Sequence, residues 1–225
     1  LLEEGDGRRP KQRAAERHKR KCLKYITDDQ ENFVKYTDTI AKQVDDIGRM
    51  VEEFVSFARM PASVFSMQDI IPIIKKSIFS SHVANSAIEY ETQFPAAPAM
   101  LYCDERQITQ VLTNLLKNAS EAIEARMEQK PNEIEKGKIT LNLAQKDDQI
   151  VLIIEDNGIG FPPGDAKAML EPYVTTRSKG TGLGLAIVKK IVEEPKGTIL
   201  LDNIPSGGAR VMLSFLSQCD INAAK

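Results

Sequence analysis

Apolar side chains recur at intervals of three and four between residues 33 and 58, which predicts an amphipathic helix. Their stripe resembles a seam along which helices pack lengthwise. A preceding helix is expected over residues 14–26, a basic stretch without Gly or Pro and with a weaker stripe. The polar link Thr27-Asp28-Asp29-Gln30 would join both into a helical hairpin. The seam comprises Phe33, Tyr36, Ile40, Val44, Ile47, Val51, Phe54 and Ala58.

A hairpin of two helices cannot bury both of its faces alone. We therefore expect two copies of the chain to pair into a four-helix bundle, which makes the chain a homodimer. Pro61 marks the expected end of the second helix. This places a helical dimerisation domain over residues 1–62, a second domain over 63–218 and a short tail over 219–225.

Beyond residue 63 the pattern changes to short strands that alternate with helices. Asp69 and Asp104 are expected to cap helices that run to about Phe79 and Met127, and a third helix is expected over 181–193. Together these elements predict an α+β fold with helices on one face of a mixed sheet. The expected strands are 64–67, 87–92, 99–102, 138–143, 149–156, 198–203 and 209–215.

Composition narrows the class of protein. The 225 residues are 42% hydrophobic and 28% charged, with a formal net charge of -2, which is typical of a globular protein and does not favour nucleic-acid binding. The basic run of residues 8–24 is interpreted as a solvated face, because acids in the next helix balance it, rather than as a nucleic-acid or membrane surface. Three cysteines without paired spacing indicate neither disulfides nor zinc and fit a reducing cytoplasm. Any membrane attachment is expected to come from segments outside this chain.

One candidate site begins on the helix after Asp104. Asn114 and Asn118 are four residues apart and project from one face, and their side-chain oxygens would suit Mg²⁺. Lys117 could add positive charge beside them. By themselves these residues are equally compatible with an exposed amphipathic helix.

Two glycine-containing segments follow. Asp156 ends a strand and is followed by Gly158 and Gly160, so a carboxylate could accept a hydrogen bond from an adenine amine where the backbone can approach the ring. Taken alone, this segment more often marks an ordinary turn. The segment Gly180-Thr181-Gly182-Leu183-Gly184 opens a helix whose N–H groups could hold phosphate oxygens, and a structural loop is an equal alternative.

In this order the three segments resemble the N, G1 and G2 boxes of the histidine kinase ATP-binding domain, a Bergerat-type (GHKL) α/β sandwich shared with DNA gyrase, MutL and heat-shock chaperone ATPases. The resemblance implies ATP and Mg²⁺ as cofactors, with Asn118 and Asn114 at the metal and Asp156 at the adenine. Residues 171–180 resemble the aromatic box and lid of the kinase branch. The implied nucleotide contacts are Asn114, Lys117, Asn118, Asp156, Gly158, Gly160, Tyr173, Thr176, Arg177, Lys179, Gly180, Thr181, Gly182, Leu183 and Gly184.

Residues 46–61 are similar to the second dimerisation helix of the nitrogen-regulation (NtrY-like) sensor kinases. This resemblance implies the cytoplasmic core of an inner-membrane two-component sensor histidine kinase, an enzyme that signals to a response-regulator receiver domain. The acceptor pattern H-E-x-x-N-P does not occur in the sequence. The alignment puts Leu2 at the histidine position with Glu3 beside it, so no catalytic residue is identified.

The two histidines of the chain are not interpreted as acceptors. His18 lacks an acid directly after it and is interpreted as a structural residue, and His82 is expected in a loop. An alternative function is therefore a non-catalytic ATP-binding regulator, or a response-regulator phosphatase or scaffold. A gyrase-type or chaperone-type ATPase is a third option, which would need a water-activating Glu where Asn114 stands.

Overall fold

The computed structural model describes residues 30, 32–45, 47–48, 50–51, 54–55, 62–130, 133, 136–146, 148–162, 164, 166–175 and 180–216. The chain divides into two compact units, Leu1–Glu52 and Glu53–Lys225. The domain boundary expected after residue 62 stays a prediction. The first helix of the hairpin, the seam residue Ala58 and the tail 219–225 lie outside the described residues.

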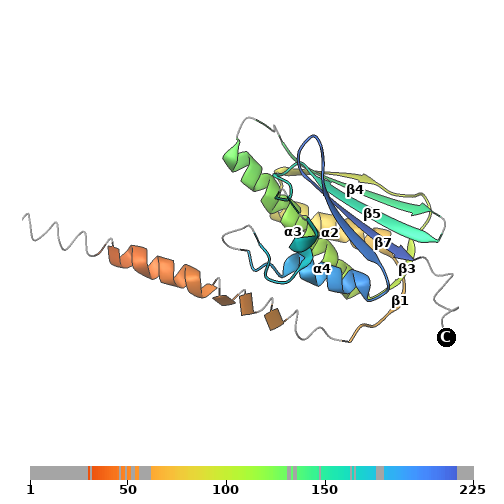
Figure 1. Cartoon of the computed structure of the whole chain (residues 1–225), viewed down its shortest axis with the longest axis horizontal. Coiled ribbons are helices and arrows are strands. Elements are labelled where there is room, and N and C mark those ends of the chain that lie inside the picture. The colour runs from red at the N-terminus through yellow and green to blue at the C-terminus, as the bar shows by residue number, and fades with distance from the viewer. Residues whose placement is uncertain are drawn as a thin grey trace, which may run out of the picture. The chain divides into compact units, whose positions relative to one another are not determined.

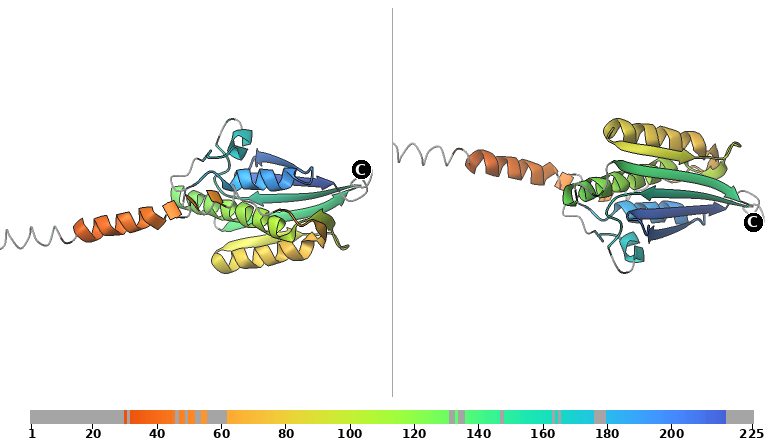
Figure 2. Two further views of the ribbon diagram at one scale, coloured as in Figure 1. Left: turned by 90° about the horizontal axis from the view of Figure 1, so that it is seen from below. Right: turned by 90° about the horizontal axis from the view of Figure 1, so that it is seen from above.

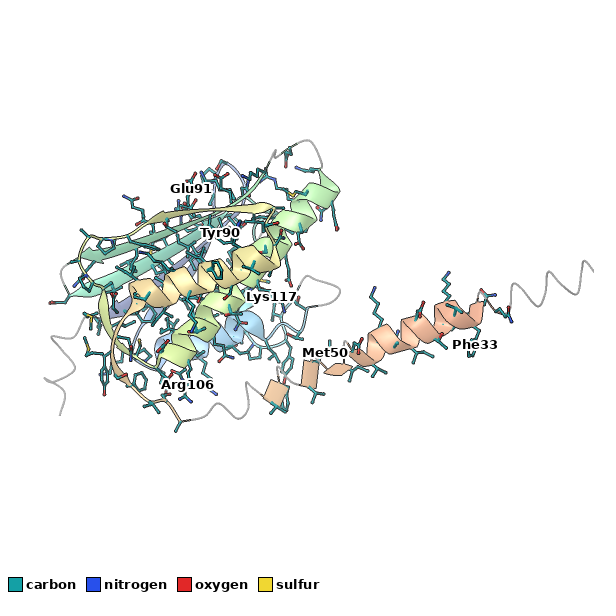
Figure 3. All side chains as sticks on the ribbon, turned by 180° about the vertical axis from the view of Figure 1, so that it is seen from behind. Phe33, Met50, Tyr90, Glu91, Arg106 and Lys117 are labelled. Carbon is teal, nitrogen blue, oxygen red and sulfur yellow. The ribbon has the colours of Figure 1, made fainter. Side chains whose placement is uncertain are left out.

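The first unit contains the predicted seam helix. Residues 32–45 are helical, and helical positions continue at 47–48 and 50–51. Phe33 and Met50 mark the two ends of this stretch (Figure 3). The seam residues Phe33, Tyr36, Ile40 and Val44 are 60–68% exposed. Within the described residues, the apolar stripe therefore has no cover.

The second unit contains a five-stranded sheet (Figure 1). The two strands at one edge of the sheet run parallel to each other, and every other neighbouring pair is antiparallel, so the sheet is mixed as predicted. Apolar and less buried positions alternate along the central strands, so one face of the sheet carries the core. The strand order is β2 (Ile88–Gln93), β4 (Gly137–Lys146), β5 (Gln149–Asp156), β7 (Ala209–Leu216) and β6 (Thr198–Asn203).

Three helices cover this apolar face: α2 (Ile70–Ala84), α3 (Glu105–Gln129) and α4 (Gly184–Glu193). The two views in Figure 2 show the second unit once from the side of its helices and once from the side of its strands. The predicted arrangement of helices on one face of a mixed sheet is confirmed. None of the helices within the described residues combines the length and the apolar character that crossing a membrane requires.

The predicted caps begin two of the helices. Asp69 accepts a hydrogen bond from the N–H of Ile71, and Asp104 accepts one from the N–H of Arg106. Helix α2 continues five residues beyond Phe79, because no helix-breaking residue intervenes before Asn85. The expectation of a loop at His82 was therefore wrong: His82 lies in the last turn, with its ring edge-on to Tyr90.

The remaining elements differ more from the sequence expectation. Strand β1 (Ser66–Asp69) starts after residue 64 and pairs with β3 (Met100–Cys103) in a separate two-stranded antiparallel sheet. The N–H of Val64 donates instead to a carboxylate oxygen of Asp104, 2.9 Å away. A short 3₁₀ helix, η1 (Ala166–Leu170), lies between β5 and α4 along the chain.

Candidate functional site

Asp156 is the last residue of β5 and is 8% exposed. Its Oδ1 atom accepts hydrogen bonds from the N–H of Gly158 at 2.8 Å and from the N–H of Ala209 at 3.3 Å. Burying a charged group requires such compensation, and the two bonds also fix the direction of the carboxylate. The sheet thus holds the carboxylate that the sequence singled out for adenine.

The turn of residues 157–160, which follows this carboxylate, lies directly on α3. A Cβ atom at Gly158 would come within 2.6 Å of the backbone of Ala122. The N–H of Ile159 donates to the Ala122 carbonyl oxygen at 3.1 Å. Gly160 has a φ of +75°, which glycine tolerates without strain. Glycine is thus required at 158 by close packing and favoured at 160 by the backbone.

Two side chains outside the predicted boxes also hold this turn. Arg126, near the end of α3, donates from Nη1 to the carbonyl oxygens of Asn157 at 3.0 Å and Gly158 at 3.2 Å. Asn203, at the end of β6, accepts from the N–H of Phe161 at 2.7 Å and donates to its carbonyl oxygen at 3.0 Å. Sequence reasoning missed both, since its only signal was a basic residue in the last turn of a helix and an asparagine at a strand end.

The asparagines of the predicted N box lie on α3. Within the described residues, the Nδ2 atom of Asn114 is buried and has no hydrogen-bond partner. The position that a Cβ atom would take at Gly184 is 3.8 Å from the Nδ2 atom of Asn118. The structure therefore brings the N box and the start of α4 together. Lys117 lies on an exposed side of α3 (Figure 3).

Within the described residues, helix α4 starts without a side-chain cap. Its N-cap residue, Leu183, makes no side-chain capping bond, and its side chain is in the core at 2% exposure. Thr181 accepts from the N–H of Leu183 at 3.3 Å, which shapes the approach to the helix. An uncapped helix N-terminus next to an asparagine side chain suits the phosphates of a nucleotide. Gly180 is partly buried before it.

Residues 171–175, in the predicted aromatic box, contact the segment Gly180–Gly184 at Gly182. Gly182 has a φ of +69°, and a Cβ atom there would come within 2.6 Å of the Tyr173 backbone. The N–H of Tyr173 donates to the Gly182 carbonyl oxygen at 3.1 Å, while the tyrosine itself is 63% exposed. Glu171 and Lys189 form an ion pair at 3.0 Å, and this carboxylate raises the pKa of Lys189. This pairing ties the segment to α4.

Thr176, Arg177 and Lys179, in the predicted lid, lie outside the described residues, as do Leu2 and Glu3 at the aligned acceptor position. Their roles stay predictions. What the structure brings to one end of the sheet is the carboxylate of Asp156, the asparagines of α3 and the start of α4.

The residues present fit a nucleotide with a bound magnesium ion. The buried amide of Asn114 has no partner within the described part of the chain, and a ligand oxygen would satisfy it. Asparagine side-chain oxygens are suitable ligands for Mg²⁺, which keeps several waters and bridges phosphates. Asn118, beside the start of α4, is therefore suited to hold a phosphate-bound cation, and Asp156 is suited to bind a base.

Residues 103–218 match the family described as histidine kinase-, DNA gyrase B- and HSP90-like ATPase. This match covers α3, the sheet from β4 onward and all three predicted boxes.

Individual relatives agree with this family. The nitrogen regulation protein NtrY of Azorhizobium caulinodans is 46% identical over 210 residues, which are 93% of this chain and 27% of the relative. The signal transduction histidine-protein kinase AtoS of Escherichia coli is 28% identical over 80% of this chain and 28% of its own length. The solved mycobacterial sensor histidine kinase MprB matches with a TM-score of 0.59 and 25% identity, over 68% of this chain and 97% of that one. This chain thus spans little more than a quarter of either curated relative.

Proposed function

Because the chain belongs to the histidine kinase-, DNA gyrase B- and HSP90-like ATPase family, as the ATP-binding core of an NtrY-like sensor histidine kinase, we propose that it binds ATP with Mg²⁺ for phosphoryl transfer to a histidine. A response-regulator receiver domain would then accept the phosphoryl group. The working form is a homodimer that operates in the cytoplasm.

Each part of the site has a separate task in this proposal. Asp156 accepts a hydrogen bond from the exocyclic amine of adenine, and the turn of residues 157–160 lets the base approach the backbone. The first N–H groups of α4 bind phosphate oxygens. Asn118, with Asn114, holds Mg²⁺, which neutralises phosphate charge when it is bound.

The observation that carries this function is the buried, fixed carboxylate of Asp156. A charge with 8% exposure that takes two backbone N–H bonds is a preorganised acceptor at the end of the sheet. It stands in the same unit as a helix start that lies against an asparagine. A base acceptor and a phosphate site in one unit favour a nucleotide over either ligand alone.

Replacing Asp156 with Asn tests the assignment. The amide keeps the size of the side chain, but the charged acceptor is lost, and a hydrogen bond to a charged group contributes about 1.5–3 kcal/mol. We expect the affinity for ADP with Mg²⁺ to fall about 10- to 100-fold in isothermal titration calorimetry. Asp148→Asn, at an exposed turn, is the matched control and should bind as the wild type does. Unchanged binding by Asp156→Asn would refute the base contact.

The metal assignment has its own test. Removing Asn118's oxygen with Asn118→Ala should abolish the gain in ADP affinity on adding Mg²⁺, while binding measured in EDTA should change little. Thr113→Ala, at an exposed position of the same helix, serves as the control. If both variants respond to Mg²⁺ like the wild type, Asn118 is not a metal ligand.

A second candidate function is favoured by the sequence at the acceptor position. Leu2 and Glu3 stand where a phosphorylated kinase has His and an acid, so the chain could act as a nucleotide-dependent regulator or phosphatase of a receiver domain. Radiolabelled ATP separates the two functions. Label on His18 or His82 would support self-phosphorylation by this chain, whereas faster decay of a phosphorylated receiver in the presence of ATP, with no label on the chain, would support the regulator.

A further inference from the structure

We propose that Arg126 and Asn203 are positioning residues for base selection. They hold the turn of residues 157–160 so that Asp156 accepts a hydrogen bond from an amine of the base and disfavours a carbonyl group. Neither residue belongs to the predicted boxes, and neither needs to touch the nucleotide. The inference rests on the proposed function, because it specifies how the same site would distinguish adenine from other purines.

The planarity of the peptide bond gives Arg126 its influence. The Asn157 carbonyl oxygen accepts a hydrogen bond from Arg126 Nη1 at 3.0 Å. This carbonyl lies in the same peptide plane as the N–H of Gly158, which donates to Asp156 Oδ1 at 2.8 Å. Fixing one end of this plane therefore fixes the other. In the same way, the Gly158 carbonyl, 3.2 Å from Nη1, shares a plane with the N–H of Ile159, which donates to α3.

The guanidinium has little freedom to leave this position. Its side chain is only 13% exposed, and Nε donates to Glu133 at 2.9 Å. A Cβ atom at Gly207 would come within 2.6 Å of Nη1, so the loop after β6 closes over it. Glu133 is also paired with Lys130 at 2.8 Å, and the two cations, Lys130 and then Arg126, lower the pKa of this carboxyl. Arg126 is thus held from three sides.

Asn203 fixes the far end of the turn. Its amide makes two bonds with the backbone of Phe161, the residue directly after Gly160. A Cβ atom at Gly160 would be 2.7 Å from its Oδ1 atom, so the two segments are in close contact. Asn203 is more exposed than Arg126, and we expect the smaller effect from it.

The chemical consequence concerns the group at position 6 of a purine. Adenine presents an amine there, which donates to a carboxylate, whereas hypoxanthine presents a carbonyl oxygen, which is repelled by one. If the peptide plane before Gly158 can rotate, the carboxylate loses one of its fixed donors and can turn away from the base. Loss of Arg126 should therefore weaken discrimination between ADP and IDP more than it weakens binding of the shared ribose and phosphates.

The test compares the affinities for ADP and IDP, both with Mg²⁺, in calorimetry of the full 225-residue chain. The wild type should prefer ADP. Arg126→Gln should reduce this preference about tenfold, and Asn203→Asp, which keeps the acceptor but loses the donor, about threefold. Lys130→Gln is the control, because it removes the other cation on Glu133 without touching the turn, and it should keep the wild-type preference.

Thermal unfolding of the same variants separates positioning from simple structural support. If the affinities for ADP and IDP fall by one common factor, with or without a fall in Tm, the inference is overturned. Should Arg126→Gln fail to fold, Arg126→Lys and Asn203→Asp decide the matter in the same way. A wild type without preference for ADP would overturn the proposed function as well, whereas a preference that survives in every folded variant overturns this inference alone.

Discussion

Individual glycines of the site are required for different physical reasons. At Gly158 a Cβ atom would strike the backbone of Ala122 at 2.6 Å, and at Gly208 it would lie against the carbonyl group of Asp156. These two positions need glycine for the fold itself. At Gly184 the nearest atom, on Asn118, is 3.8 Å away, which is an ordinary contact distance. Within the described residues the fold therefore gives no reason for glycine at 184, whereas a phosphate of the proposed nucleotide would supply one.

Gly184→Ala should accordingly separate stability from binding. The residue is the first of α4, where alanine is favoured over glycine by up to about 1 kcal/mol, so Tm should stay level or rise. The added methyl group would occupy space beside the phosphate donors and should lower the affinity for ADP about tenfold. Calorimetry and thermal unfolding on one sample measure both quantities.

Two further variants control this result. Gly158→Ala should lower Tm and affinity together, because its clash is with the protein backbone. Gly48→Ala meets nothing within 4 Å and should change neither Tm nor affinity by a large amount. An affinity unaffected by Gly184→Ala would argue against phosphate at the start of α4.

At the scale of elements, the start of α3 depends on one carboxylate. Asp104 accepts from the N–H of Arg106 at 2.9 Å, from its guanidinium at 2.7 Å and from the N–H of Val64 at 2.9 Å. The guanidinium beside it, at the start of α3 (Figure 3), lowers the pKa of this carboxyl well below its ordinary range, and the two backbone N–H groups add to the effect against the opposing influence of burial. The same side chain therefore caps the helix and holds the segment before β1.

Asp104→Asn should destabilise the second unit by about 1–3 kcal/mol at pH 7, since it replaces a buried charged acceptor with a neutral one. The sign of the pH dependence follows from the lowered pKa. The charged form contributes stability above the unfolded value of about 4, and this contribution is lost as the pH falls toward the folded value. The difference between wild type and variant should therefore shrink on acidification below pH ~4, as urea unfolding would measure.

Asp148→Asn, at its exposed turn, is the matched control and should track the wild type at each pH. A difference between Asp104→Asn and wild type that stays constant from neutral to strongly acidic pH would mean that the cap charge does not stabilise the fold.

The elements that the sequence predicted well are those determined by nearby residues. The caps Asp69 and Asp104 and the strand Gln149–Asp156 follow from local chemistry and alternation, and all three are confirmed. The pairing of β1 with β3 and the parallel pairing of β2 with β4 join distant segments, which no local pattern encodes. Arg126 and Asn203 were missed for the same reason, because they reach the turn of residues 157–160 only through tertiary contacts.

At the scale of the whole molecule, the exposed apolar stripe of the first unit is suited to pack against another helix. Phe33, Tyr36, Ile40 and Val44 repeat along one side of a helix and are at least 60% exposed within the described part of the chain. A continuous apolar row of this kind is typical of a helix that packs lengthwise against others. This supports the predicted homodimer.

Ile40→Lys should convert the predicted dimer to a monomer, because burying a lysine in an apolar seam is costly. Sedimentation velocity at micromolar concentration would measure the change in mass. Thr39→Lys, one position off the stripe, should leave the dimer intact. The affinity for ADP should be the same in both variants. A wild-type chain that sediments as a monomer would contradict the prediction.

The order of the strands also determines when the second unit can fold during synthesis. Strand β7 lies between β5 and β6, so β6 emerges from the ribosome before the strand that it pairs with. Until residue 209 and those after it follow, one edge of β5 stays open and the buried positions of β7, Val211, Leu213 and Phe215, are missing from the core. The second backbone hydrogen bond to the Asp156 carboxylate, from the N–H of Ala209, can therefore form only after β7 has been synthesised.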